Sequence, residues 1–115
     1  MRVMVVGSRR IARYDVVRET LDRSPYKIDV LLSGRAAGVD TLAEEWAAEH
    51  QIPIEYFPLN WKLHTRNAVL IRNCEMARAA DACVAIWDGH SRGTWRMIEV
   101  AAHYKLQVTI HNVDE

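Results

Sequence analysis

Short apolar runs alternate along this chain with longer segments whose apolar residues recur at helical spacing. The run Val3–Val6 is mostly β-branched and ends at Gly7, a pattern typical of a strand buried on both faces. In Val39–His50 the apolar residues fall on one stripe, which predicts an amphipathic helix. The same criteria predict strands at Val3–Val6, Val30–Leu32, Pro53–Phe57, Ala82–Trp87 and Gln107–Ile110, and helices at Tyr14–Leu21, Val39–His50, Arg66–Ala79 and Thr94–Tyr104.

The last two predicted helices have apolar positions spaced to face a core, and the segment before them has little pattern. The core positions are Val69, Leu70, Cys74 and Ala77 in the first of these helices and Met97, Ile98, Ala101 and Ala102 in the second. We expect a loop over Leu59–Thr65.

Strands that alternate with helices predict an α/β fold in which right-handed crossovers build a parallel sheet between two helix layers. We expect a Rossmann-like three-layer sandwich, formed as a single domain over residues 1–115. The expected order of its five-stranded parallel sheet is 3-2-1-4-5. In such a sheet the chain reverses the direction in which strands are added between strands 1 and 4, and ligands bind beyond the carboxyl ends of the strands at that point.

Three loops rich in glycine, serine and arginine follow the first, second and fourth predicted strands. They are Gly7-Ser8-Arg9-Arg10, Ser33-Gly34-Arg35-Ala36-Ala37-Gly38-Val39-Asp40 and Asp88-Gly89-His90-Ser91-Arg92-Gly93-Thr94. Because these strands are neighbours in the predicted order, we expect the loops to converge on one crevice. Helix N-termini attract phosphate, glycine admits a ligand close to the backbone, and arginine supplies a planar set of donors. The loops therefore predict a nucleotide-like or phosphorylated ligand.

Composition narrows the class of protein further. The 115 residues include 15 basic and 15 acidic side chains, a balance that argues against a protein that coats nucleic acid. The apolar N-terminal run is too short for a signal peptide or a membrane span. We interpret Cys74 and Cys83 as core thiols of a protein in a reducing cytoplasm. The histidines show no metal-ligand spacing, and we expect neither a metal nor a cofactor.

The loop motifs, together with Ile71-Arg72-Asn73 and Met76, resemble the YspA-type, YpsA-related branch of the SLOG superfamily. The segment Ser33–Asp40 is similar to the phosphate-binding loop of DprA-like proteins. The stretch from Arg72 to Thr94 is similar to a region of LOG-type enzymes, which remove ribose 5′-phosphate from a cytokinin nucleotide. The resemblance implies a sensor of a nucleotide or nucleotide derivative, with Arg72 holding a phosphate and Asn73 contacting a base or sugar.

The chain departs from the family pattern at three places. Arg35 replaces a second glycine, and Val69-Leu70 replaces a Gly-Pro pair, which suggests an earlier helix start. LOG enzymes carry a carboxylate two or three residues after Gly-Thr, whereas the nearest acid here is Glu99. A LOG-like N-glycosidase or phosphoribohydrolase, with Arg72 and Glu99 as its catalytic residues, is therefore the alternative to a binding module.

Each candidate ligand contact also has a structural interpretation. In the loop Ser33–Asp40, Ser33 would offer its hydroxyl to a phosphate, and Gly34 and Gly38 would let backbone N–H groups approach it. Asp40 would brace the loop or hold a ligand hydroxyl. The alternative is that this segment is only a tight turn between a strand and a helix. In the loop Asp88–Thr94, Gly93 and Thr94 would donate hydrogen bonds to a phosphate, and Asp88 would accept one from a sugar or base. The structural interpretation of the same loop is a helix start that is capped by Ser91 or Thr94. The remaining candidates are Gly7, Ser8 and Arg9 in the crevice, Gly89 in the third loop, and Trp61 as a base-stacking side chain or a loop anchor.

We therefore expect a module that binds a nucleotide or nucleotide-derived ligand, with the LOG-like hydrolase as the alternative. A DprA-like binder of single-stranded DNA is a third possibility, which the balanced charge disfavours. Arg10 and Arg13 are expected to be solvated. A chain this short forms a shallow crevice, so we expect a homodimer or larger oligomer through the helices that follow strands 3 and 4.

Overall fold

Five parallel strands form one sheet in the order β3-β2-β1-β4-β5, which confirms the predicted topology. The computed structural model describes residues 1–60, 62 and 65–113. The strands are β1 (Arg2–Gly7), β2 (Val30–Ser33), β3 (Ile54–Tyr56), β4 (Ala82–Trp87) and β5 (Gln107–Asn112). The helices are α1 (Tyr14–Asp22), α2 (Val39–Glu49), α4 (Ala68–Ala79) and α5 (Arg92–His103), and a 3₁₀ turn over Thr65–Asn67 precedes α4.

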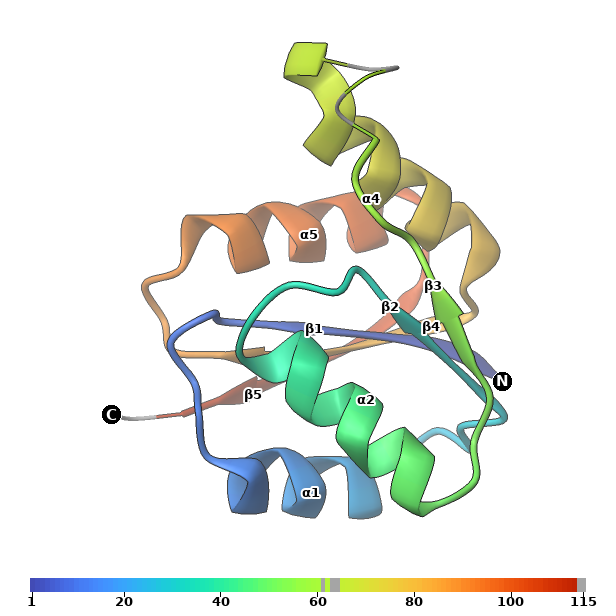
Figure 1. Cartoon of the computed structure of the whole chain (residues 1–115), viewed down its shortest axis with the longest axis vertical. Helices are drawn as coiled ribbons and strands as arrows, with labels where there is room; N and C mark the ends of the chain where they lie inside the picture. The colour runs from blue at the N-terminus through green and yellow to red at the C-terminus, as the bar shows by residue number, and fades with distance from the viewer. Residues whose placement is uncertain (61, 63–64, 114–115) are drawn as a thin grey trace.

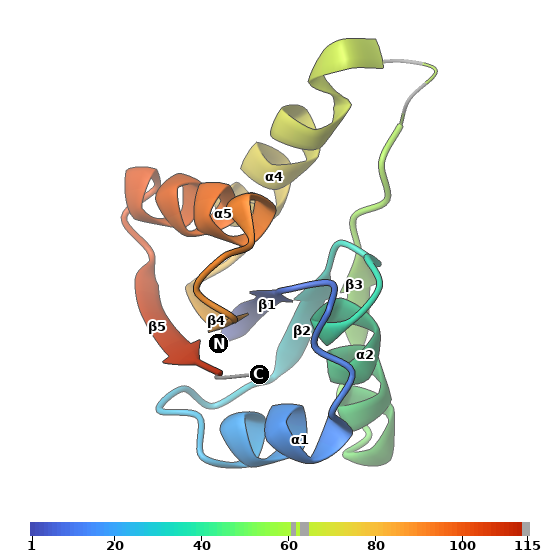
Figure 2. The same ribbon diagram turned by 90° about the vertical axis from the view of Figure 1, so that its left-hand side faces the viewer.

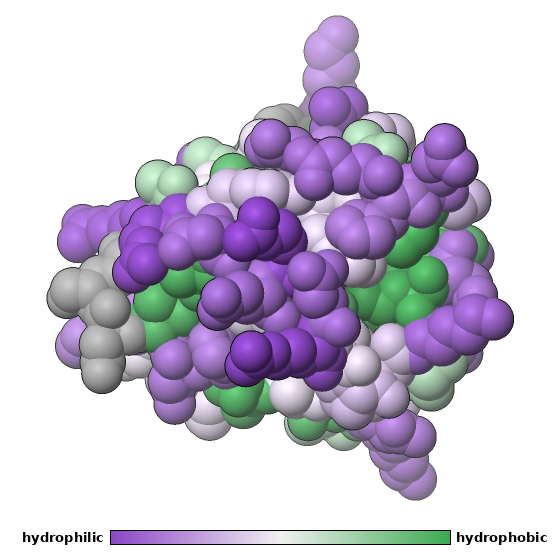
Figure 3. Space-filling view, turned by 90° about the horizontal axis from the view of Figure 1, so that it is seen from below, coloured by the Kyte–Doolittle hydropathy of each residue, from purple (hydrophilic) through white to green (hydrophobic). Residues whose placement is uncertain are grey.

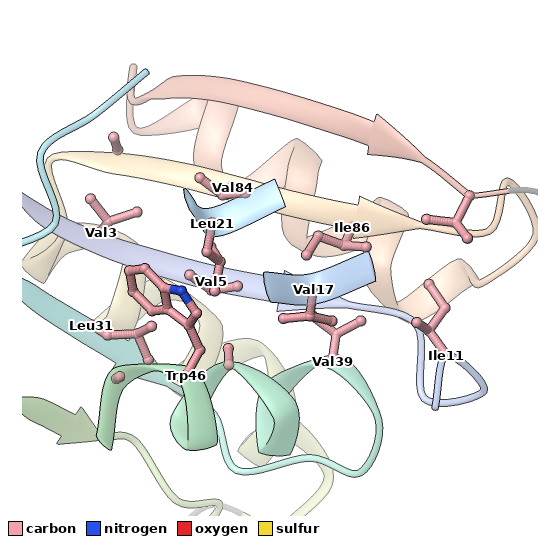
Figure 4. Packing of buried hydrophobic residues seen from close by; sticks show 14 residues of the cluster. Val3, Val5, Ile11, Val17, Leu21, Leu31, Val39, Trp46, Val84 and Ile86 are labelled. Atoms are coloured by element: carbon pink, nitrogen blue, oxygen red, sulfur yellow. The ribbon is translucent and has the colours of Figure 1, made fainter. Parts of the chain in front are cut away.

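The sheet lies between two helix layers, with α1 and α2 on one face and α4 and α5 on the other (Figure 1). Successive side chains of a strand point to opposite faces, and β1 therefore supplies both cores. Val3 and Val5 pack with Val17, Leu21 and other apolar side chains beneath α1 and α2 (Figure 4). Met4 and Val6 belong to the core on the other face. This double burial explains the continuous apolar run in the sequence.

The outer surface of α1 and α2 is mostly hydrophilic, with smaller apolar areas between the charged side chains (Figure 3). The two helices are thus amphipathic, and their apolar stripes pack on the sheet as predicted. None of the helices in the described ranges is long and apolar enough to cross a bilayer.

The predicted core face of α4 is wrong at its N-terminal end. Val69 is 42% exposed and Leu70 57% exposed, whereas Ala68, Met76 and Ala77 are buried. The N-terminal end of α4 extends beyond the sheet (Figures 1 and 2), so these two side chains have no strand beneath them. The spacing of apolar residues does not show which of them will have a strand to pack against.

Four smaller predictions also need correction. Ala102 is exposed, and α5 buries Thr94, Met97, Ile98 and Ala101 instead. Cys74 is only half-buried, whereas Cys83 is fully buried, and burial raises the pKa of its thiol to about 12. The α5 helix begins at Arg92, two residues earlier than predicted, and β5 continues to Asn112.

Candidate functional site

A crevice lies at the carboxyl ends of β1, β2 and β4, and these strand ends face the viewer in Figure 2. Its volume is about 410 Å³, within the range of small-molecule sites. Residues from all three predicted loops line it, together with side chains of α4 and α5. The lining residues are Val6, Gly7, Arg9, Gly34, Arg35, Ala36, Asp40, Leu59, Val69, Arg72, Asn73, Met76, Ser91, Gly93, Thr94 and Met97.

The loop after β1 is held in place by very close backbone packing. A Cβ atom at Gly7 would lie 2.4 Å from the carbonyl oxygen of Ile86, so only glycine fits there. Ser8 is buried, and its hydroxyl accepts the N–H of Asp88 at 3.1 Å, which ties this loop to the one after β4. Ser8 therefore has a structural role and does not line the crevice, whereas Arg9 does.

The loop after β2 uses its polar groups mainly to hold its own shape. The Ser33 hydroxyl donates to Glu44 at 2.6 Å and accepts the N–H of Arg35 at 3.1 Å. Ser33 is fully buried and lies outside the crevice lining, so the structure does not place its hydroxyl where a phosphate would reach it. Gly38 has a φ of 77°, and a Cβ there would lie 2.6 Å from the carbonyl oxygens of Ser8 and Arg9. Gly38 therefore serves the packing of α2 on the β1 loop.

Asp40, in the first turn of α2, is the buried acid of the crevice. It is 6% exposed, and its carboxylate accepts the N–H of Ala36 at 3.2 Å, as expected for a residue that braces the loop. Burial raises the pKa of Asp40 to about 7, although the Ala36 N–H and the positive charges of Arg72 and Arg9 act in the opposite direction. Asp40 is thus placed to titrate near neutral pH.

Arg72 reaches across the crevice from α4 and is half-buried. Its guanidinium donates to the carbonyl oxygen of Gly34 at 2.8 Å, and its Nε donates to the side-chain oxygen of Asn73 at 2.9 Å. A Cβ at Gly34 would lie 2.6 Å from a guanidinium nitrogen of Arg72, so glycine at this position makes room for the arginine. Gly34 and Asn73 therefore position Arg72.

The loop after β4 is ordered by Asp88 and capped by Ser91. One carboxylate oxygen of Asp88 accepts the N–H groups of His90 and Ser91, both at 2.8 Å, and these bonds lower the pKa of Asp88. The Ser91 hydroxyl accepts the N–H of Thr94 at 3.3 Å, an N-cap of α5. Thr94 is buried and Gly93 exposed, and both line the crevice.

The sequence was compared with protein families and with known proteins. A model of the YspA, cpYpsA-related SLOG family matches residues 1–64, which run from β1 through β3 and include the first two crevice loops. The chain belongs to this family. It is also 37% identical over 103 residues to the Gene 61 protein of Mycobacterium phage D29, which covers 81% of this chain and 82% of that protein.

The departures from the family pattern have structural explanations. Arg35 has a φ of 62°, a conformation that favours glycine, which accounts for the glycine usual at this position. Its side chain lies over the ring of Tyr56, 4.4 Å from the ring centroid, and lines the crevice without filling it. At the second departure, α4 begins at Ala68, and Val69 forms part of the crevice wall.

Several candidate residues lie elsewhere. Glu99 is exposed and lines a separate hollow between α4 and α5 with Leu70 and Tyr104, so it is not brought to Arg72. Asp88 lines a different hollow, beside Arg9 and Arg10. Gly89, with a φ of 84°, shapes the loop that carries Asp88 but lines neither the crevice nor this hollow. Trp61 lies outside the described residues.

One wall of the crevice is apolar, and the sequence did not predict it. Leu59, Val69, Met76 and Met97 contribute to it. The helical spacing predicts Val69 and Met97 as core residues; Met97 does pack in the core and also lines the crevice, whereas Val69 is exposed. Helical periodicity separates an inner from an outer face, but it does not separate a core contact from a crevice contact on the same face.

Proposed function

We propose that the crevice binds a nucleotide or a nucleotide-derived phosphorylated ligand, and that the protein is a binding module that senses it. The observation that carries this proposal is the convergence of three arginines, a helix N-terminus and an apolar wall on one cavity. The family to which the chain belongs supports nucleotide-related chemistry without naming a ligand.

The phosphate is expected over the N-terminus of α5. Ser91 caps the N–H of Thr94, and within the described chain the N–H groups of Arg92 and Gly93 have no hydrogen-bond partner. Free N–H groups in the first turn of a helix and the helix dipole both favour an anion. Gly93 has open space above its Cα, which lets a phosphate approach these N–H groups.

The charges around the cavity also favour an anion. Arg9, Arg35 and Arg72 line it, and Asp40 is the only carboxyl group among the described lining residues. Because Asp40 has a pKa of about 7, its negative charge is partly neutralised at physiological pH. The described residues that line the crevice therefore carry a net positive charge in a protein that is neutral overall, although Arg35 also pairs with Glu44 at 3.8 Å.

The apolar wall suits a base or another flat ring. Leu59, Met76 and Met97 line the crevice together with the polar groups. Methionine is flexible and polarisable and packs well against aromatic rings. A cavity of about 410 Å³ has room for a ligand of mononucleotide size.

The hydrolase alternative retains one supporting observation. Glu99 lies outside the crevice, but the pKa of Asp40, about 7, suits a general acid or base. Under this alternative Asp40 would take the catalytic role that the sequence led us to expect of Glu99. Release of free base from nucleoside monophosphates, lost in Asp40→Asn, would favour the enzyme over the sensor.

A matched pair of variants at Gly93 tests the phosphate site. A Cβ atom at Gly93 would meet no atom within 4 Å, so we expect both Gly93→Asp and Gly93→Asn to fold. The negative charge of an aspartate in the first turn also interacts favourably with the helix dipole, which stabilises the helix. We expect Gly93→Asp to weaken nucleotide binding by at least about tenfold, through charge repulsion worth roughly 1.4 kcal/mol, and Gly93→Asn to weaken it far less.

Isothermal titration calorimetry of the two variants measures this difference, and circular dichroism checks their folding. Equal affinities of Gly93→Asp and the parent protein for the same nucleotide would exclude the α5 N-terminus as the phosphate site.

A further inference from the structure

A second hollow of about 330 Å³ adjoins the crevice. It is lined by Arg9, Arg10, Asp88, His90 and Ser91, and it shares Arg9 and Ser91 with the crevice. The two cavities therefore meet along one boundary, formed by the β1 loop on one side and the α5 cap on the other. A ligand that occupies the crevice and extends past Arg9 would enter this second hollow.

The fold presents Arg9 and Arg10 at the tip of a tight turn. Ser8 and Ile11 on either side of them are buried, and the N–H of Ile11 donates to the carbonyl oxygen of Ser8 at 3.3 Å. Close packing at Gly38 fixes the backbone of this turn against α2. The two exposed guanidinium groups are thus displayed by a rigid backbone.

Neither guanidinium has a close ionic partner among the described residues, although the charge of Arg9 also acts on Asp40. In the described ranges Arg9 and Arg10 form no ion pair or side-chain hydrogen bond, whereas Arg13, a few residues further on, pairs with Asp15 at 3.0 Å. Asp88 is the one carboxylate among the described residues that line the hollow, and one of its oxygens is engaged by the N–H groups of His90 and Ser91. The described lining of the hollow therefore holds two arginines and one carboxylate, and the loop of that carboxylate fixes its position.

We infer that this hollow is a second subsite that takes a second anionic group, so that the ligand class carries two phosphates rather than one. The inference rests on the proposed function, in which the first phosphate lies over α5. A nucleoside diphosphate or a pyrophosphate-linked nucleotide would place one phosphate near Gly93 and the other between Arg9 and Arg10. A nucleoside monophosphate would leave Arg10 without a role.

The test compares nucleotides that differ by one phosphate. Calorimetric titrations use AMP against ADP and GMP against GDP, with the parent, Arg10→Gln and Arg13→Gln. For at least one base, the parent should bind the diphosphate about tenfold more tightly than the monophosphate, a factor typical of one charge-assisted hydrogen-bond pair. Arg10→Gln should remove this preference and leave monophosphate affinity within about twofold.

Arg13→Gln is the matched control, because it removes the same charge from an exposed arginine outside both cavities. It should retain the preference for diphosphates. Equal affinities for mono- and diphosphates in the parent, or a loss in Arg10→Gln that is the same for both, would overturn the second subsite and leave the proposed function intact. Failure of all four nucleotides to bind would overturn the proposed function, and the second subsite with it.

Discussion

At the residue scale, the polar groups of the site divide into those that build the loops and those that face the ligand. Ser8, Ser33 and Gly38 hold the loops together, while Arg9, Arg72 and Gly93 face the cavity. Asp40 does both, because it braces the loop and also lines the crevice. Because Asp40 is buried beside the arginines, its protonation state affects both the stability of the fold and the charge that a ligand meets.

The raised pKa of Asp40 predicts a pH-dependent stability. The folded carboxyl has a pKa of about 7, against 3.8 when unperturbed, so the folded state binds more protons than the unfolded state between these values. The contribution of Asp40 to stability is therefore present below pH 4 and is lost as pH rises towards 7. The loss amounts to at most about 4 kcal/mol for a shift of this size.

Asp40→Asn removes this titration and keeps an oxygen that can accept the Ala36 N–H. The variant should be more stable than the parent at pH 8, and the two should converge near pH 4. Urea denaturation of both proteins across this range isolates Asp40 from the other carboxyl groups. A stability difference that does not change with pH would contradict the assignment.

At the element scale, the N-terminal end of α4 presents apolar side chains to solvent. Val69 and Leu70 are exposed there, and Leu70 adjoins a shallow hollow with Cys74, Val100 and Tyr104 between α4 and α5. An apolar helix end of this kind is suited to contact with a second copy of the chain. This is the face where the sequence led us to expect a dimer.

Leu70→Lys should convert that dimer into a monomer without unfolding it, because the side chain it replaces is 57% exposed in the single chain. Size-exclusion chromatography with light scattering at about 50 μM measures the change. Ala48→Lys places the same charge on the exposed side of α2 and should leave the mass unchanged. A monomeric parent protein would show that α4 is not a dimer contact.

The predictions from sequence succeeded where local pattern decides the structure. Buried parallel strands are continuous apolar runs, and β4 was predicted with its observed bounds. The predictions failed where a distant partner decides. The hydroxyl of Ser33 donates to Glu44 of α2, and Glu99 lines the hollow beside α4. The spacing of residues along the chain does not predict either contact.

At the scale of the whole molecule, the sheet order explains why the site forms at all. β1 lies between β2 and β4, so the loops after these three strands meet at one edge although they are up to eighty residues apart in the chain. The bond from the N–H of Asp88 to Ser8 is one such long-range contact. The topology therefore brings the N-terminus of α5, the β1 loop and the guanidinium of Arg72 to a single cavity.

The most direct test of nucleotide binding is thermal unfolding of the parent protein with a panel of nucleotides. AMP, ADP, ADP-ribose, NAD, GTP and cyclic nucleotides would each be added at about 1 mM. A ligand at roughly 100 times its Kd stabilises the folded state by about 2.7 kcal/mol and should raise the Tm by several degrees in a chain of this size. A clear increase for one class of nucleotide is the predicted result, and an unchanged Tm across the whole panel would contradict the nucleotide-binding account.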